Sequence, residues 1–187
     1  MAFQKTAKNF NRKFGRRFSK NFKRRGNGMS IKQKIVRKMK PLNENEMKEG
    51  KFLVDTSAII NQKVSSLAKK GLKGLILVPN AAMAELENLA NKGNEIGFSG
   101  LDEIAKLHSF KALKVRFVGP RPTEHQIRYA KSGEIDALIR NLAYESRAIL
   151  ITADVVQAKS AEAYGLKVLF VKTRQETPKR KFLFFHK

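Results

Sequence analysis

There is no cysteine in this sequence. Its absence excludes disulfides, thiolate-bound zinc, iron–sulfur clusters and a cysteine nucleophile, and it is consistent with a reducing compartment. No apolar run approaches the roughly 20 residues that cross a bilayer, and the N-terminus lacks the hydrophobic segment of a secretory signal. A P-loop motif is also missing. We therefore expect a cytoplasmic protein without a membrane span or a nucleotide-hydrolysing module.

Acidic residues are scarce. Sixteen of them stand against 39 lysines and arginines, which gives a formal net charge of +23. Residues 1–51 carry 17 basic and 3 acidic side chains, residues 52–171 carry 16 and 12, and residues 172–187 carry 6 and 1. The middle of the chain is thus an ordinary globular composition between two cationic arms. Arms of this kind imply a polyanionic partner.

The sequence divides into three parts. Residues 1–50 are predicted to be a basic N-terminal arm and linker, residues 51–172 a folded domain, and residues 173–187 a basic, aromatic C-terminal tail. Within the arm, apolar residues at helical spacing predict a helix over 29–40, and 43–50 is expected to be a polar linker. Met29 is an alternative start, so the presence of residues 1–28 in the mature protein is left open.

The folded domain alternates between short apolar runs and helical patterns. Strands are predicted at residues 52–54, 75–78, 115–118, 148–152 and 168–171. Capping residues place helix starts at Ser57, Asn80, Ser99, Thr123, after Gly133 and at Val155. Uninterrupted apolar strands separated by helices indicate a parallel sheet of about five strands with helices on both faces. We therefore expect an α/β fold.

Four acids lie near the positions where such a fold binds ligands. Asp55 directly follows the first predicted strand, and Asp154 lies two residues past the fourth. Glu85 and Asp136 lie near the starts of two helices. Ligands bind at the carboxyl ends of parallel strands, so these side chains are expected to converge. Converging carboxylates repel each other and raise the pKa of at least one of them. Mg²⁺ or Mn²⁺ would remove that conflict.

Each acid also has an ordinary structural explanation. An Asp after a strand is usually a helix cap or a turn residue, Asp136 suits the positive end of a helix dipole, and Glu85 could be a solvated charge. Glu134, two residues from Asp136, points to another side of its helix. The joint placement of the four acids, rather than any one of them, favours a site.

Four segments resemble the motifs of PIN-domain ribonucleases. They are Phe52–Ile60, with its Asp55-Thr56-Ser57; Pro79–Leu86, which contains Glu85; Gly133–Ala137, with Asp136; and Ile151–Gln157, with Asp154. They occur in the family's order and spacing over about residues 52–171. The fourth segment looks closest to archaeal PIN domains that are fused to an ATPase and a KH module. Neither module is present in these 187 residues.

The resemblance implies a Rossmann-like three-layer α/β/α sandwich and a phosphodiester hydrolase that depends on one or two Mg²⁺ or Mn²⁺ ions. It implies that Asp55, Asp136 and Asp154 are metal ligands, directly or through water. Glu85 would bind a second ion or act as an orienting base. The hydroxyls could bond the carboxylates or the scissile phosphate, or equally cap helices and pack at strand ends. These hydroxyls belong to Thr56, Ser57 and Thr152.

The N-terminal arm combines cations with regularly spaced rings. Phe10, Phe14, Phe18 and Phe22 recur every four residues. The cations among them are Arg12, Lys13, Arg16, Arg17, Lys20, Lys23, Arg24 and Arg25. Basic side chains bind phosphates and aromatic rings stack on unpaired bases, so RNA is the favoured partner. Two alternatives are an anionic membrane surface and a mitochondrial transit segment.

The functional hypothesis is a metal-dependent endoribonuclease in RNA processing or decay. The alternative is a non-catalytic protein that binds RNA, ribosomal RNA or the ribosome and uses the PIN fold as a scaffold. A PIN-type toxin is a third reading, which the long basic arm disfavours. A homodimer is expected by analogy with the family alone.

Overall fold

The computed structural model describes residues 30–39, 44–129 and 133–172. The chain divides into two units, one ending at Arg37 and one beginning at Lys38. In the first unit, helix α2 (Ile31–Lys38) confirms the helix predicted from the spacing of apolar residues. It starts with a capping box, in which the amide of Gln33 donates to Ser30 Oγ and the amide of Ser30 donates to Gln33 Oε1. The expected arm residues 10–25 and tail 173–187 lie outside the described residues.

The second unit is built on one parallel sheet. Its strands are β1 (Gly50–Val54), β2 (Gly74–Pro79), β3 (Leu113–Val118), β4 (Ile149–Thr152) and β5 (Val168–Phe170), in the order β3-β2-β1-β4-β5. All neighbours pair in parallel. The five predicted strands are therefore confirmed, with small shifts at their ends. The chain leaves β1 toward β2 and returns to β4 on the other side, so the strand order reverses between β1 and β4.

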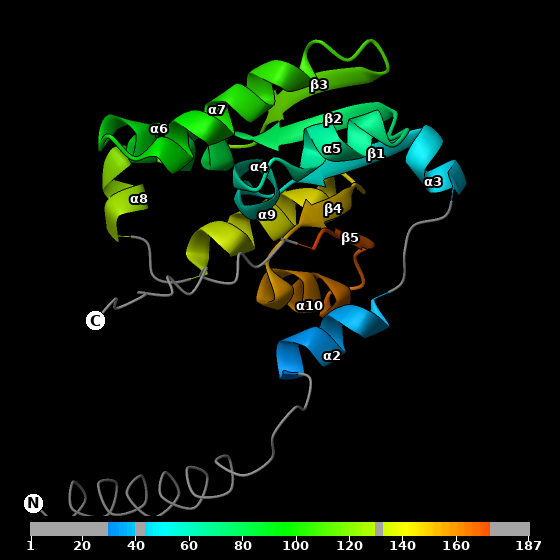
Figure 1. Cartoon of the computed structure of the whole chain (residues 1–187). Helices are drawn as coiled ribbons and strands as arrows, with labels where there is room; N and C mark the ends of the chain where they lie inside the picture. The colour runs from blue at the N-terminus through cyan, green and yellow to red at the C-terminus, as the bar shows by residue number, and fades with distance from the viewer. Residues whose placement is uncertain (1–29, 40–43, 130–132, 173–187) are drawn as a thin grey trace, which may run out of the picture. The chain divides into compact units, whose positions relative to one another are not determined.

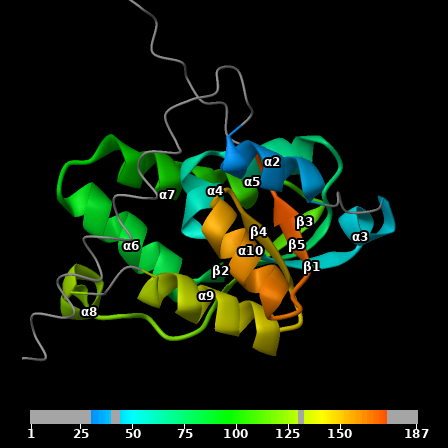
Figure 2. The same ribbon diagram turned by 90° about the horizontal axis from the view of Figure 1, so that it is seen from below.

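Helices cover both faces of the sheet (Figures 1 and 2). Helices α4 (Thr56–Ile60), α5 (Lys63–Lys69) and α7 (Glu95–Leu107) contact one another, and α6 (Asn80–Asn91) packs along α7. Helices α9 (Glu134–Glu145) and α10 (Val155–Ala163) contact each other and lie together in Figure 2. Right-handed crossovers from a sheet of this order put the two groups on opposite faces, so the α/β/α layering is as expected.

The core lies between the sheet and these helices. Phe52, Leu53, Ile76, Leu150 and Ile151 have no exposed surface at all. Because both faces of β1 and β4 are covered, these strands read as continuous apolar runs rather than alternating ones. No helix in the described ranges is both long and apolar enough to cross a membrane.

Several local predictions differ from the structure. Asn80 is the first residue of α6 and not its cap, which is Pro79. The expected linker over 43–50 contains helix α3 (Glu44–Lys48), and β1 already starts at Gly50. The predicted helix start at Ser99 was wrong: α7 starts four residues earlier and is capped by Asn94, whose side chain accepts the amide of Ile96. A Cβ on Gly97 would lie 2.3 Å from the amide nitrogen of Ala90. Glycine therefore serves the close packing of α6 and α7 here and does not mark a loop.

The apolar spacing in α9 predicts that Ile135, Leu138, Ile139 and Leu142 all face inward. Ile139 is buried and Ile135 and Leu142 pack on the core, as their spacing predicts, whereas Leu138 is 42% exposed. The helix is therefore less completely covered than its apolar stripe suggests. Helix α8 (Glu124–Tyr129) follows the predicted cap, because Thr123 Oγ1 accepts the amide of Gln126.

Candidate active site at the carboxyl edge of the sheet

Asp55 stands at the point where the strand order reverses. It is the residue after β1, its amide donates to the carbonyl of Ile151 in β4 (2.9 Å), and only 2% of its surface is exposed. Asp154 follows β4 as the N-cap of α10. Open parallel sheets bind ligands in the crevice at this kind of switch point, so both strand-end acids lie where the fold rule predicts.

Two hydroxyls fix the carboxylate of Asp55. Ser57 Oγ donates to Asp55 Oδ2 at 2.6 Å, and Thr152 Oγ1 donates to the same oxygen at 2.7 Å. Each hydroxyl in turn accepts a backbone amide, Ser57 from Ala153 at 2.9 Å and Thr152 from Asp154 at 3.0 Å. Because every proton in this network has an acceptor, the direction of the Asp55 carboxylate is set by both β1 and β4.

Glu85 is held by the third hydroxyl. Thr56 Oγ1 donates to Glu85 Oε2 at 2.6 Å, across 29 residues of sequence. The three hydroxyls that were expected either to bond carboxylates or to cap helices therefore bond carboxylates. The predicted cap role of Ser57 is wrong, because the N-cap of α4 is Asp55. A hydroxyl proton has a stronger acceptor in a nearby carboxylate than in a backbone carbonyl.

Asp154 fulfils its ordinary structural role as well. Its Oδ1 accepts the amides of Val156 (2.6 Å) and Gln157 (3.1 Å) and so caps α10. The cap uses one oxygen and holds the carboxyl group in a single orientation. The helix cap and a ligand role are thus compatible in this side chain.

Gln157 is the residue that sequence reasoning missed. It is 2% exposed, and its Nε2 donates to the carbonyl of Asp136 at 2.9 Å. Its own backbone amide donates to Asp154 Oδ1, so one residue ties the start of α9 to the start of α10. Its Oε1 is buried without a partner among the described residues. The only signal in the sequence is a glutamine three residues after a capping Asp, which is common on solvated helices.

The acids influence one another electrostatically. Burial raises the pKa of Asp55 above its ordinary value, and the charge of Asp154 adds to the rise, while the bonds from Ser57 and Thr152 oppose it. Burial also raises the pKa of Glu85, with contributions from the charges of Asp55 and Asp136. The expected repulsion is present, but loss of water is the larger cause of the raised pKa.

Asp136 belongs to the same group. Its pKa is raised first by burial and then by the charges of Asp55 and Asp154, and the charge of Arg140 lowers it. Arg140 is directed elsewhere, because its guanidinium lies over the ring of Tyr164 at 4.6 Å and donates to Ser160 Oγ at 3.0 Å. Within the part of the chain that the structure describes, none of the four acids forms a salt bridge.

The donor set fits a hard divalent cation in kind. It consists of carboxylate and hydroxyl oxygens with no nitrogen or sulfur, which suits Mg²⁺ or Mn²⁺. Across the described ranges no three acidic or histidine side chains approach closely enough to form a ready-made metal cage. Mg²⁺ commonly keeps several waters and uses only one or two carboxylates.

Known proteins share this sequence pattern and fold. The family model of the PIN domain matches residues 52–163. An uncharacterized KH and PIN-domain containing protein of Methanocaldococcus jannaschii is 38% identical over 153 residues, which is 79% of this chain and 24% of that protein. An uncharacterized PIN and TRAM-domain containing protein of Synechocystis is 30% identical over 124 residues, 64% of this chain and 33% of that protein. This chain thus spans between a quarter and a third of these relatives.

A solved structure agrees with the fold. It is a domain of a functionally unknown protein from Methanocaldococcus jannaschii, 39% identical in sequence, with a TM-score of 0.64. The similarity covers 68% of this chain and 94% of that domain. The five-stranded parallel arrangement is therefore shared over nearly the whole of the solved domain.

Proposed function

The chain belongs to the PIN-domain family, a family of nucleases, and on this premise we propose that it is an endoribonuclease that depends on Mg²⁺ or Mn²⁺. Its reaction would be hydrolysis of RNA phosphodiester bonds, in RNA processing or decay. The observation that carries the proposal is the group of four acids at one edge of the sheet. Three of them have raised pKa values and none is paired with a cation in the described residues.

Burying carboxylates beside one another is unfavourable unless a cation joins them. A scaffold for RNA binding gains nothing from this arrangement, because phosphates are repelled by it. A metal site gains a set of ligands whose positions are fixed before the ion binds. The unfavourable free energy of keeping these acids together therefore supports catalysis over the alternative of a non-catalytic RNA- or ribosome-binding protein.

Each residue has a proposed role. Asp55, Asp136 and Asp154 hold the ion, directly or through water, and Glu85 holds a second ion or orients the attacking water. When bound, the ion supplies an activated water and stabilises the charge that develops on the phosphate. Ser57 and Thr152 keep the Asp55 carboxylate pointed in one direction, and Thr56 does the same for Glu85.

RNA is the proposed substrate because of the cationic arms. Residues 1–51 have a formal excess of basic over acidic residues of 17 to 3, with phenylalanines among them. Such segments bind phosphates and stack on unpaired bases. The domain itself would then cut a strand that the arms help to retain.

The test is a cleavage assay with the full chain on structured and single-stranded RNA, with single-stranded DNA of the same sequence in parallel. Cleavage should require Mg²⁺ or Mn²⁺, stop in EDTA, and be lost in Asp55→Asn and Glu85→Gln. Glu87→Gln is the matched control, because Glu87 lies on the same helix and pairs with Arg121 instead. Full activity of Asp55→Asn, or RNA binding without cleavage under any of these conditions, would refute the proposal.

A further inference from the structure

A second charged region lies at the opposite end of the same sheet. The first residues of β1, β2 and β3 stand side by side there, with Gly50 opposite Gly74 and Gly74 opposite Leu113. A depression of about 440 Å³ opens at this amino edge. Its lining carries five lysines and one glutamate, namely Lys48, Lys51, Lys73, Lys111, Lys114 and Glu49. We call these five lysines the lysine edge.

The lysine edge is brought together by the register of the strands. Lys51 is aligned with Leu75, and Leu75 is aligned with Lys114. Two strand spacings therefore separate the backbones of Lys51 and Lys114, about 10 Å. Lys73 and Lys111 lie just before β2 and β3. Cations from three segments thus surround one depression, in the same way that acids gather at the other edge.

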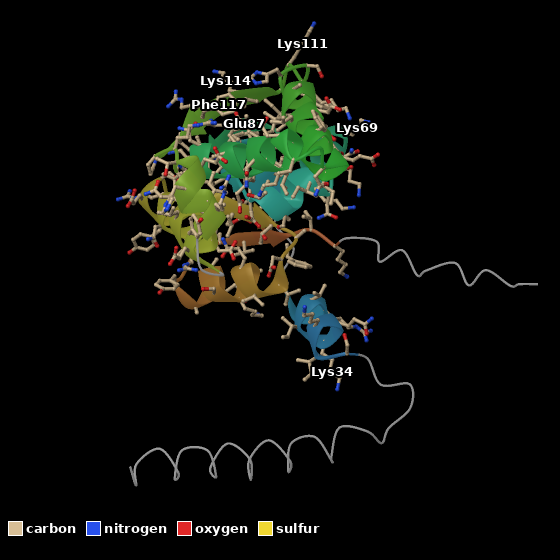
Figure 3. The ribbon with its side chains drawn as sticks, turned by 90° about the vertical axis from the view of Figure 1, so that its left-hand side faces the viewer. Lys34, Lys69, Glu87, Lys111, Lys114 and Phe117 are labelled. Carbon is tan, nitrogen blue, oxygen red and sulfur yellow. The ribbon has the colours of Figure 1, made fainter. Side chains whose placement is uncertain are left out.

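The side chains of three of these lysines have no partner within residues 30–39, 44–129 and 133–172. The ammonium groups of Lys73, Lys111 and Lys114 make no hydrogen bond or ion pair with any described residue, and all three side chains are exposed. Lys51 differs, because its Nζ donates to the carbonyl of Ser146 at 3.1 Å. Figure 3 shows Lys111 extending away from the ribbon at the β3 side. Five lysines against one glutamate in the lining give a local excess of positive charge, which attracts an anion.

Close packing requires glycine at two positions of the lining. A Cβ on Gly74 would lie 2.2 Å from the carbonyl oxygen of Gly50, and Gly74 has a φ of +121°, which other residues rarely adopt. A Cβ on Gly50 would lie 2.2 Å from the ring of Phe52. Both strands therefore start without a side chain, and the lysines stand around bare backbone.

The sequence repeats a pattern at these positions. Each of the three strands is entered through two lysines three residues apart: Lys48 and Lys51, Lys70 and Lys73, Lys111 and Lys114. Strands β4 and β5 are not entered in this way. The sheet thus has four acids near its carboxyl edge and five lysines at its amino edge.

We propose that the lysine edge binds the phosphate backbone of an RNA strand, at a second site on the domain beyond the acids. The proposal rests on the proposed function only for the identity of the polyanion as RNA. Strands of five or six residues put the two edges about 17–20 Å apart. An RNA strand that is cut at the acids and continues around the domain would bind the lysines through phosphates distant from the cleaved bond.

The chemistry of the depression favours nucleic acid over the other polyanions. A membrane surface binds flat cationic faces that also carry large apolar side chains. This lining is concave, and its apolar side chains are only Leu75 and Ala112. Lysine is a point charge that contacts phosphate without reading sequence. Contacts of this kind would be independent of RNA sequence.

The experiment measures RNA affinity of the full chain by fluorescence anisotropy, in EDTA and at several salt concentrations. The pocket variant is Lys73→Glu/Lys111→Glu/Lys114→Glu. The matched control is Lys69→Glu/Lys92→Glu/Lys106→Glu, three exposed lysines outside the lining that also form no ion pair with a described residue and that change the net charge by the same amount. In Figure 3 Lys69 lies well apart from Lys114. A triple Lys→Gln variant at the pocket covers the case in which charge reversal disturbs folding.

For a single-stranded RNA of about 20 nucleotides, the pocket variant should lose roughly tenfold or more in affinity. The slope of log K against log salt should fall by about 2, because three phosphate contacts contribute about 0.7 each. The control should change both quantities much less. An equal loss in the two variants, an unchanged slope in the pocket variants, or lysine-dependent binding to phosphatidylserine vesicles with RNA binding unaffected would overturn the proposal.

The two proposals fail separately. Binding is measured without metal, so it does not depend on cleavage. If the chain never cuts RNA but the pocket variant loses RNA affinity, the nuclease proposal is refuted and the lysine-edge proposal stands. A chain that cuts RNA through Asp55 with no effect of the pocket variant would do the reverse.

Discussion

The two edges of the sheet are assembled by the same topology but held in different ways. At the carboxyl edge, Asp55 and Glu85 are fixed by hydroxyl bonds of 2.6–2.7 Å, and Asp154 by two backbone amides. At the amino edge, Lys73, Lys111 and Lys114 are exposed and have no partner among the described residues. Fixed groups can act at one atom of a substrate, whereas mobile charges act on any phosphate nearby. The comparison predicts that the acids are individually essential and the lysines individually replaceable.

After the loss of cleavage expected for Asp55→Asn and Glu85→Gln, the next largest effect is expected at Asp136. Asp136→Asn should lower kcat/KM for RNA by roughly 10²–10³-fold, a typical loss when one preorganised group at the reacting centre is removed. The matched control is Glu134→Gln on the same helix, where Glu134 is exposed; it should stay within about threefold of the wild type. If the two variants were equally active, the carboxyl edge would not be the site of reaction.

A smaller effect is expected at Gln157, which positions Asp136 without belonging to the acid group. Gln157→Met keeps the volume but removes the bond to the Asp136 carbonyl. Because small displacements at a reacting centre are costly, kcat should fall about tenfold, with KM nearly unchanged. Stability should change by less than about 1.5 kcal/mol. A fall in thermal stability with kcat unaltered would leave Gln157 with a packing role only.

The acids should make the metal-free domain less stable at neutral pH. The pKa values of Asp55, Glu85 and Asp136 are raised in the folded state, above all by burial. The folded form therefore keeps the protons of these carboxyl groups to a higher pH than the unfolded form does. As a result, the free energy of unfolding falls as the pH rises from the pKa of the unfolded state, near 4, through the raised pKa of the folded state. Urea unfolding in EDTA at successive pH values should show this decline, and saturating Mn²⁺ should reverse it.

Asp55→Asn should make the free energy of unfolding depend less on pH. At pH 7 without metal, removing one desolvated charge should stabilise the domain by about 1 kcal/mol, because the amide oxygen can still accept the bonds from Ser57 and Thr152. The variant should gain nothing from Mn²⁺. A metal-free variant less stable than the wild type at neutral pH would show that Asp55 is held by favourable interactions instead.

The smallest effect is expected for a single lysine. Lys111→Gln should weaken RNA binding by less than about threefold and reduce the salt slope by about 0.7, with kcat unchanged. The salt titration described for the triple variants measures it. A loss in the single variant as large as in the triple one would mean that the amino edge is a fixed site like the acids, and the contrast between the edges would fail.

Much of the fold followed from local patterns. The apolar runs predict all five strands, because strands covered on both faces have no polar alternation to obscure them. Asp55 and Asp154 follow from the rule on strand ends. Glu85 and Asp136 do not, since a helix charge near a start is ordinary, and only the resemblance to PIN domains assigned them. The start of α7 was misplaced because Gly97 and Gly100 resemble loop residues until their contacts with α6 are known.

The remaining features depend on contacts between distant segments. Gln157 is significant only because it reaches the carbonyl of Asp136, 21 residues away. The lysines of the amino edge come from three segments that look like separate solvated loops. Their proximity is set by strand register, and register cannot be read from lysines that lie in separate segments of the chain.

The bond from Thr152 to Asp55 joins residues 97 positions apart, and Ser57 reaches the amide of Ala153 over 96. Contacts over such separations form after the local ones. During synthesis, β1, β2, β3 and the helices on their face leave the ribosome while β4 is still being made. Asp55 therefore lacks its bond from Thr152, although its bond from Ser57 is local, until β4 has emerged. An incomplete chain ending before β4 would carry the lysines and three of the four acids but lack Asp154 and the hydroxyl of Thr152, so cleavage would be acquired only on completion of the domain.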